Sequence, residues 1–397
     1  MAEISLDMYQ TLGIAVVVLL VGAWLKKKIR ALNKFCVPAP VVGGLLYALI
    51  MFVLYLYGIV EIHYDETLKN VCMVFFFTSV GFQANVKVLK KGGVGLIIFL
   101  AVVVGMIFAQ NGLAILIAGL LGMDPALGLC TGSVPMVGGH GTSGAFGPIL
   151  EDFGVTGATT LCTASATFGL VAGSLMGGPL GEHLIKKKNL LEKVKEEDPT
   201  VLVEDTKKHH HQASMYAAAT YQLAIAVGIG TIISWLLSKT GMTFPVYIGA
   251  MIIAAIMRNV GEATGKITIH MGEINDIGGI CLSIFLGIAM ITLKLWQLAD
   301  LALPMLILLA GQLLLMFIIA RFVVFNVMGR DYDAAVLAAG TCGFGMGATP
   351  NAMANMQAVS DKYVPSVKAY ILVPIVGSMF ADFLNSLIIT LFINIVK

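Results

Sequence analysis

Residues 132–147 read GSVPMVGGHGTSGAFG, a glycine-rich stretch that lies within apolar sequence yet does not suit an ordinary membrane helix. Glycine inside a helix costs roughly 1 kcal/mol relative to alanine, and non-helical backbone is tolerated at membrane depth only where protein or water satisfies it. A second such stretch, residues 340–351, reads GTCGFGMGATPN. Two interrupted apolar segments at matching places in two halves of a chain indicate a transporter binding site.

The composition is that of a polytopic membrane protein. Of the 397 residues, 58% are hydrophobic and 12% are charged, whereas soluble domains carry about 25% charged residues. Residues 8–25 could imitate a signal peptide, but acidic residues precede them and three lysines follow. We therefore expect a retained first helix with its N-terminus outside. The six cysteines form no C-x-x-C pair and are expected to be small buried hydrophobes.

The apolar segments divide the chain into two membrane domains, residues 1–185 and 213–397, joined by a polar linker at 186–212 that is expected in the cytoplasm. His209, His210 and His211 in this linker fit a charged, solvated segment better than a metal site. Each half has six apolar segments, which lie at roughly 8–25, 38–60, 70–86, 93–121, 125–150, 158–185, 214–238, 244–257, 275–293, 300–328, 334–357 and 367–395.

The two halves repeat at an offset of about 207 residues. Residues 138–142 correspond to 345–349, and 122–124 correspond to 329–331. Lys87 corresponds to Lys294 at the same offset, and we align residues 40–44 with 245–249 at an offset of 205. A nearly constant offset over four sites predicts an internal repeat.

The distribution of Lys and Arg predicts the topology. If 125–150 and 334–357 are re-entrant, each half crosses five times and the second half is inverted. The inside loops then hold 21 of the 25 Lys and Arg residues, as the positive-inside rule requires. We expect ten crossings with both termini outside. The first re-entrant segment then enters from outside and the second from inside, so their tips can meet. The long runs 93–121 and 300–328 could form a fixed scaffold and dimer face.

Glycines at a re-entrant tip let a ligand approach the backbone, and short helices direct positive dipole ends toward it. This arrangement suits a small anion together with Na⁺. There is no phosphate-binding loop for ATP, so an ion gradient must supply the energy. One charge moving through 100 mV yields about 2.3 kcal/mol, so a monoanion needs at least two cations. We predict that the substrate-binding residues are Ser133, Gly138, Gly139, His140, Gly141, Thr142, Gly345, Gly347, Ala348, Thr349, Pro350 and Asn351.

Asp382 is the only carboxylate deep in an apolar segment, and such acids are usually functional. It shares a helix face with Asn385, three residues later. We predict that Asp382 and Asn385 help to hold Na⁺, together with Asn355, Thr163 and Thr167. For each hydroxyl or amide alone, a hydrogen bond between helices remains the alternative. No organic cofactor and no nucleic-acid partner are expected.

Three alternatives remain open from the residues alone. The first is a symporter for another small carboxylate, such as a 2-hydroxy-, di- or tricarboxylate. The second is an anion channel, because paired re-entrant loops also build pores. The third is an intramembrane enzyme, since His140 lies near Ser143. That third possibility has little support because the G-x-S-x-G elbow and a nearby orienting carboxylate are both missing.

Several long motifs resemble those of the bacterial sodium/glutamate symporters: SVPMVGGHGT (133–142), ATFGLV (166–171), LKLWQLA (293–299), LPM (303–305), DYDAAVLAAG (331–340) and CGFGMGATP (342–350). The resemblance covers the chain except for the central linker. It implies Na⁺-coupled glutamate uptake across a bacterial inner membrane, inverted five-helix repeats, and a homodimer that works as an elevator. One departure is VPMV at 134–137, where smaller, hydroxyl-bearing residues would be expected.

Overall fold

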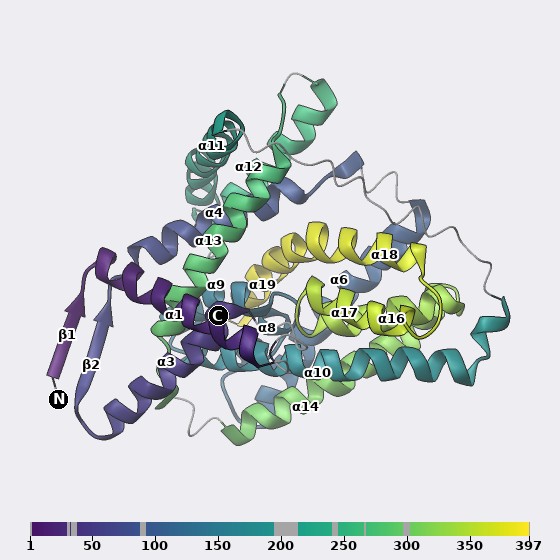
Figure 1. The fold of residues 1–397 in the computed structure, drawn as a ribbon, viewed down its shortest axis with the longest axis horizontal. Coiled ribbons are helices and arrows are strands. Elements are labelled where there is room, and N and C mark those ends of the chain that lie inside the picture. The colour runs from purple at the N-terminus through teal and green to yellow at the C-terminus, as the bar shows by residue number, and fades with distance from the viewer. Residues whose placement is uncertain are drawn as a thin grey trace.

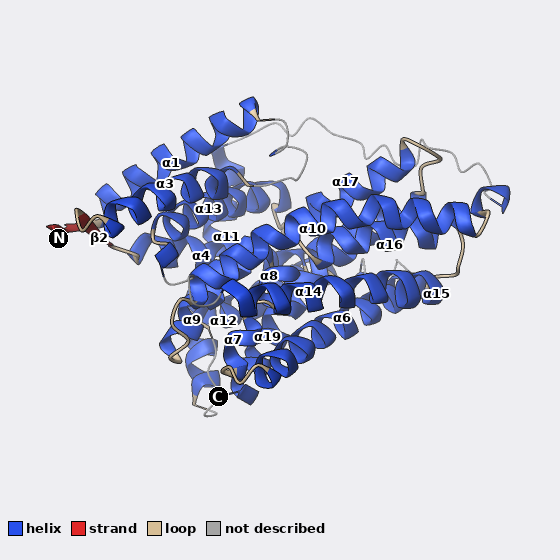
Figure 2. Ribbon diagram, turned by 90° about the horizontal axis from the view of Figure 1, so that it is seen from below, coloured by secondary structure: helices blue, strands red, loops and turns tan. Residues whose placement is uncertain are grey.

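The computed structural model describes residues 2–29, 32, 38–87, 93–193, 213–239, 245–265, 267–296 and 302–396. The described chain is almost entirely helical (Figure 2). Most of the linker, including the three consecutive histidines, lies outside the described residues, as does Cys36. The five other cysteines are free, and four of them are buried, which agrees with their expected role as small hydrophobes.

The first half places one helix on each predicted apolar segment except 125–150. Asp7 starts the first helix with a capping box, in which its carboxylate accepts a hydrogen bond from the N–H of Gln10 at 2.8 Å. The segment 125–150, which contains the first glycine-rich stretch, breaks into three short helices between two long ones. The helices are α1 (Met8–Lys28), α3 (Ala39–Leu56), α4 (Thr67–Gln83), α6 (Gly93–Leu120), α7 (Pro125–Leu129), α8 (Ser133–Met136), α9 (Gly139–Asp152) and α10 (Ala158–Lys187), followed by a 3₁₀ turn at Leu190–Lys193.

The second half repeats this order, with its own glycine-rich stretch broken into two helices. Two segments wind more widely, as π-helix, at Ile319–Val324 and Ile375–Ala381. Such segments occur mostly at functional sites. The helices are α11 (Ala213–Ser238), α12 (Val246–Thr264), α13 (Met271–Ile291), α14 (Ala302–Ile318), α15 (Phe325–Val327), α16 (Tyr332–Gly345), α17 (Thr349–Ser360), α18 (Val367–Pro374) and α19 (Asp382–Val396).

Eight helices in the described part of the chain are long and apolar enough to cross a membrane, and the bent pair α18 and α19 makes a ninth candidate. The multi-span character predicted from the composition is therefore confirmed. A further helix, α4, has 17 residues, which is the lower limit for a span of about 17–25 residues.

A short parallel strand pair accompanies the helices of this all-α membrane protein. β1 (Ala2–Leu6) pairs with β2 (Val60–Tyr64), with Ala2 opposite Val60 and Leu6 opposite Tyr64. The segments alternate apolar and polar residues with a period of two, which suits a strand. At five residues each they were too short to stand out beside the long apolar runs. The pair fixes the N-terminus next to the end of α3 (Figure 1).

The structure also corrects one alignment between the halves. Pro38 precedes α3 and Pro245 precedes α12 as N-cap residues, with nearly identical backbone angles. The equivalent of Pro245 is therefore Pro38, at an offset of 207, and not Pro40. Asp124 and Asp331 are also 207 residues apart, and each caps the first helix of a broken segment by accepting a backbone N–H at 2.8 Å. All four correspondences thus share one offset.

The helices pack into two groups. The six-helix group comprises α1, α3, α4, α11, α12 and α13, and the broken-helix group comprises α6 to α10 and α14 to α19. The six-helix group lies on the left of Figure 1, while α10, α16, α17 and α18 lie on the right. The two groups meet along α9, α13, α19 and α4.

This packing does not support the expectation that 93–121 and 300–328 form a scaffold apart from the broken segments. Gln110 of α6 donates a hydrogen bond to the carbonyl of Gly345 at 2.7 Å, and Gln312 of α14 donates to the carbonyl of Gln110 at 2.8 Å. Both amides are fully buried. An apolar run is found equally in helices that face lipid and in helices that are buried against other helices. The buried amides of Gln110 and Gln312 are what show where these two helices pack.

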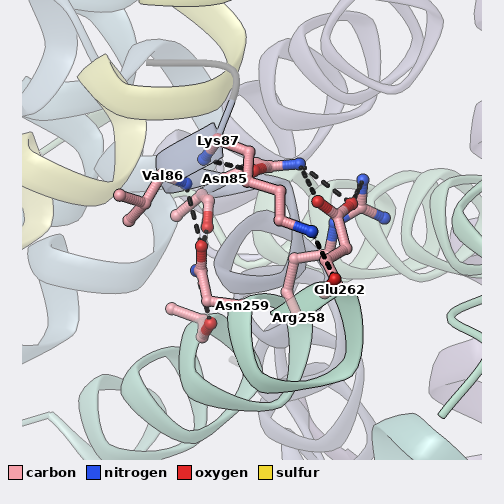
Figure 3. Close-up of polar contacts among 8 residues, drawn as sticks. Asn85, Val86, Lys87, Arg258, Asn259 and Glu262 are labelled. Atoms are coloured by element: carbon pink, nitrogen blue, oxygen red, sulfur yellow. Dashed lines mark hydrogen bonds and ion pairs between the residues drawn. The ribbon is translucent and has the colours of Figure 1, made fainter. Parts of the chain in front are cut away.

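A polar clasp joins the two halves at one end of the six-helix group (Figure 3). The side chain of Asn85, after α4, donates to both carboxylate oxygens of Glu262 at 2.9 Å, and Lys87 reaches the backbone carbonyl of Glu262. Asn259 accepts from the N–H of Val86 at 2.8 Å and donates to the carbonyl of Ala84 at 2.7 Å.

A corresponding contact joins the end of α13 to the end of α3. Lys294, the equivalent of Lys87, lies 3.6 Å from the carboxylate of Glu61. Close by, Trp296 stacks on Tyr55, with ring centroids 4.0 Å apart. Tyr55 and Glu262 are also 207 residues apart. Equivalent positions in the two halves therefore take part in both contacts, the polar clasp and the contact between α13 and α3.

Candidate functional site

The two glycine-rich stretches meet at a small cavity of about 260 Å³. Gly139 has a φ of +58°, and a Cβ atom added there would lie 2.9 Å from the carbonyl oxygen of Gly347. The two backbones therefore touch, and only glycine fits this position. In Figure 1, α8 and α9 of the first stretch lie on the side of the broken-helix group that faces the six-helix group, where α9 contacts α13. The predicted residues that line the cavity are Gly138, Gly139, His140, Gly141, Gly347, Ala348, Thr349, Pro350 and Asp382.

Two helices start at this cavity. α9 begins after Gly138 and α17 begins after Ala348, and neither N-cap residue supplies a side-chain hydrogen bond to the first turn. The first N–H groups of a helix have no partner within it, and they carry the positive end of the helix dipole. Pro350 occupies the first turn of α17, where a missing N–H costs nothing. Two uncapped helix N-termini facing one cavity can bind an anionic group.

His140 is buried, and its ring nitrogen Nε2 lies 3.0 Å from the hydroxyl oxygen of Thr167 on α10. The hydroxyl of Thr167 has one proton, which it donates to the carbonyl of Thr163 at 3.0 Å. It must therefore accept from His140, so Nε2 carries a proton. In the neutral ring Nδ1 is then unprotonated, and it can accept a hydrogen bond from a ligand in the cavity.

The arrangement around His140 does not fit a hydrolase. The hydroxyl of Ser143 donates to the carbonyls of Gly139 at 2.7 Å and Cys162 at 3.2 Å, and not to the imidazole. A nucleophilic serine needs an adjacent base that accepts its proton.

Asp382 and Asn385 approach the first broken segment from α19. Asp382 lines the cavity directly after the second π-helical segment. Asn385 donates to the carbonyl of Ser133 at 3.1 Å, and its own side-chain oxygen is buried without a hydrogen-bond partner. Ser133 is fixed further by Asn111 of α6, which bonds both its N–H and its hydroxyl at 2.8 Å.

Several predicted residues lie away from the cavity and hold the broken segments in place. Asn351 and Asn355 of α17 donate to the carbonyls of Leu170 at 3.1 Å and Gly173 at 3.0 Å on α10. The hydroxyl of Thr163 donates to the backbone carbonyl four residues earlier. The predicted residues that do not line the cavity are Ser133, Thr142, Gly345 and Asn351 of the substrate set, and Asn385, Asn355, Thr163 and Thr167 of the sodium set. Asn355 therefore lies against α10 and not in the cavity that Asp382 lines.

Sequence reasoning missed the apolar walls of the cavity. Phe76 of α4 and Leu282 and Leu286 of α13 line it from the six-helix group, opposite the tips. No sequence signal distinguishes these side chains from other apolar residues in the same helices. It also missed Gln110 and Asn111, although two adjacent amides in a long uncharged run are a usable signal for a buried polar contact.

Within the described ranges, no three His, Cys, Asp or Glu side chains gather in a way that could hold a metal ion. The polar groups around the tips are instead one carboxylate, side-chain amides, hydroxyls and backbone carbonyls. Oxygen donors of this kind, supplied by side chains and interrupted helices, coordinate Na⁺ in transporters.

The comparisons agree with the motifs. A sequence model of the family "Sodium/glutamate symporter" matches residues 4–365. The chain is 39% identical to a sodium/glutamate symporter of Escherichia coli (strain K12), over 98% of each chain. It is 37% identical to one of Haemophilus influenzae, over 95% of each chain. Among solved structures, the sodium proton antiporter MjNhaP1 from Methanocaldococcus jannaschii matches over 98% of both chains, with 14% identity and a TM-score of 0.45.

Proposed function

The chain belongs to the sodium/glutamate symporter family, and on that premise we propose that glutamate and Na⁺ bind where its two broken segments meet. The protein is a Na⁺-coupled glutamate symporter and not an enzyme. The main support for this site is that Gly139 contacts Gly347 next to Asp382. This contact lies in a cavity that apolar side chains close.

The N-termini of α9 and α17 supply positive ends for a substrate carboxylate. His140, with Nε2 occupied by Thr167, presents its other nitrogen as an acceptor that suits the substrate ammonium group. Glycine at 138, 139, 141 and 347 brings the backbone of both tips within reach of the ligand. The other predicted substrate residues do not line the cavity, and in this proposal they hold the tips in place: Ser133, Thr142, Gly345 and Asn351.

Asp382 and Asn385 are the sodium ligands that the geometry supports best. Among the described residues, Asp382 is the one carboxylate that lines the cavity, and the buried side-chain oxygen of Asn385 has no hydrogen-bond partner. Asn355, Thr163 and Thr167 already bond to the protein, so we assign them to positioning. Uptake of a monoanion against the membrane voltage requires at least two cations. We therefore expect a second sodium site, to which backbone carbonyls near the tips contribute.

We propose two inverted repeats, residues 1–185 and 213–397, each with five crossings and one re-entrant stretch. Counting α4 as a span gives ten crossings. Contacts between loops support this topology, because segments assigned to one side of the membrane touch one another. Lys362 pairs with Glu182 at 2.7 Å on the side assigned to the cytoplasm, and the clasp of Figure 3 lies on that side too. Lys294 and Glu61 meet on the outside.

On this topology both termini lie outside the inner membrane of a bacterial cell, and β1 pairs with β2 on that outer side. Transport then requires the cavity to face each side in turn. We propose that the broken-helix group slides as an elevator against the six-helix group, which supplies Phe76, Leu282 and Leu286 as a fixed wall. The resemblance implies a homodimer, which we propose forms through the six-helix group.

Uptake of labelled glutamate into proteoliposomes tests this proposal. An inward Na⁺ gradient should drive accumulation, and an excess of unlabelled glutamate should compete more strongly than di- or tricarboxylates. Uptake that is equal with and without the gradient would contradict coupling. The elevator is tested separately by cysteine pairs across α9 and α13, whose crosslinking should differ with and without Na⁺.

A further inference from the structure

A second and larger cavity lies between the two helix groups, apart from the tips. This crevice has a volume of about 930 Å³. Its walls are α4, α11 and the start of α12 on one side and α9 on the other. On the proposed topology these parts of the helices occupy the outer half of the membrane.

The polarity of the crevice changes along its depth. Its outer end is lined by Glu66, Lys69, Asn70 and Asp152. Its deeper part is lined by apolar side chains, among them Val74, Phe75, Ala145, Ile149 and Val227. Apolar residues on its walls, such as Val71 and Val246, are about half exposed, so the crevice opens toward the surrounding bilayer.

The length of the crevice matches one leaflet. From Glu66 to Phe75, α4 rises by about 14 Å at 1.5 Å per residue. Half of a hydrocarbon core of about 30 Å is about 15 Å. An apolar space of this depth, open to the membrane, is filled by hydrocarbon more favourably than by water. We propose that the crevice binds one acyl chain of an outer-leaflet phospholipid, with its headgroup at the polar end.

The charges at the polar end indicate the class of headgroup. Lys69 is only 3% exposed and pairs with Glu66, so its ammonium group is fixed at the crevice mouth. Glu66 and Asp152 give this end two carboxylates for one ammonium. Because Lys69 is buried in its pair with Glu66, Asp152 leaves this mouth net negative, so it attracts a lipid amine and repels a purely anionic headgroup. The ligand is therefore a zwitterionic lipid of the phosphatidylethanolamine class.

The position of this lipid gives it a role in transport. The crevice walls belong to α4 and α9, which lie in different helix groups. If the groups slide past one another, which rests on the proposed function, a chain held between them must move or be released during each cycle. The bound lipid then sets the rate of sliding without touching the glutamate site.

Native mass spectrometry of the purified protein tests the binding directly. Val227→Trp narrows the crevice from α11, and Ile149→Trp narrows it from α9, so the test does not depend on one variant folding. Val17→Trp is the matched control, because Val17 is 59% exposed on α1 and does not line the crevice. Each protein is incubated with phosphatidylethanolamine or with phosphatidylglycerol before the lipid is diluted.

The wild type and the Val17→Trp protein should retain one phosphatidylethanolamine per subunit, and both crevice variants should lose it. Equal retention by all four proteins, or no retention by the wild type, would overturn the site. Equal retention of phosphatidylglycerol would overturn the headgroup assignment. Glutamate uptake is measured on the same preparations, so the expected lipid pattern without uptake would support this site and contradict the proposed function.

Discussion

Replacing Gly139 with alanine perturbs the contact on which the proposed glutamate site depends. The position has a φ of +58°, and a left-handed backbone costs an alanine roughly 1–2 kcal/mol. The added Cβ would also lie 2.9 Å from the carbonyl oxygen of Gly347. Because non-bonded atoms are best separated by about 3.5 Å or more, the tips must move apart by roughly half an ångström.

Gly58→Ala separates these two effects. Gly58 has a similar φ of +66°, but nothing lies within 4 Å of the position where its Cβ would be. Both variants therefore carry the backbone strain, and only the alanine at position 139 pushes the tips apart. Since a displacement of about 1 Å at a binding site can cost about 100-fold in rate, we expect Gly139→Ala to lower glutamate uptake about 10-fold or more relative to Gly58→Ala.

The assay is the initial rate of Na⁺-driven glutamate uptake into proteoliposomes over a range of glutamate concentrations, at equal amounts of reconstituted protein. Thermal unfolding of each protein reports the strain shared by the two variants. If Gly139→Ala transports with the wild-type KM and rate, or if Gly58→Ala loses as much activity, the reasoning about touching tips is refuted.

The remaining predictions concern four other polar contacts. Asp382→Asn should abolish the dependence of uptake on Na⁺ while leaving thermal stability nearly unchanged, and a normal Na⁺ response would exclude Asp382 as a ligand. Thr167→Val leaves the Nε2–H of His140 unpaired and should weaken glutamate binding by about 1 kcal/mol or more, seen as a several-fold higher KM that Thr167→Ser restores. Asn111→Ala leaves the N–H and the hydroxyl of Ser133 without their partner and should destabilise the protein by about 1–3 kcal/mol, measured by thermal unfolding. Asn259→Ala removes the two hydrogen bonds of the clasp to Val86 and Ala84 and should cost a similar amount without changing KM for glutamate; an altered KM would mean that the clasp affects the site.

Much of the helix pattern could be predicted because each membrane segment is long and apolar. The glycine-rich stretches were recognisable for the opposite reason, since glycine at that density weakens a membrane helix. The short strands were missed because five-residue segments such as Val60–Tyr64 carry little signal beside spans of twenty residues. The offset at Pro40 was wrong because two prolines, Pro38 and Pro40, fit the pattern almost equally.

The site was predictable only where a residue type is unusual in its setting. Asp382 stands out as a carboxylate deep in an apolar segment, and Gly139 and Gly347 stand out within broken helices. Asn351 and Asn355 stand out as well, but they bind the backbone of α10. A buried amide serves a helix contact as readily as a ligand, and only the three-dimensional partners distinguish these roles. Phe76 and Leu282 carry no signal because any apolar residue can form such a wall.

The assignment of 93–121 and 300–328 to a scaffold failed for a related reason. Both runs are long and nearly uncharged, and hydropathy does not distinguish a helix that faces lipid from one buried against another helix. The amides of Gln110, Asn111 and Gln312 fix these helices to the broken segments. Where two or more amides interrupt such a run, they indicate which helix belongs with the binding site.

The most direct measurement is an experimental structure with glutamate and Na⁺ bound. Glutamate density should lie between residues 138–141 and 347–350, with a carboxylate at the N-termini of α9 and α17 and a sodium ion beside Asp382. Glutamate bound elsewhere, with Gly139 and Gly347 still in contact and no ligand between the tips, would contradict the account.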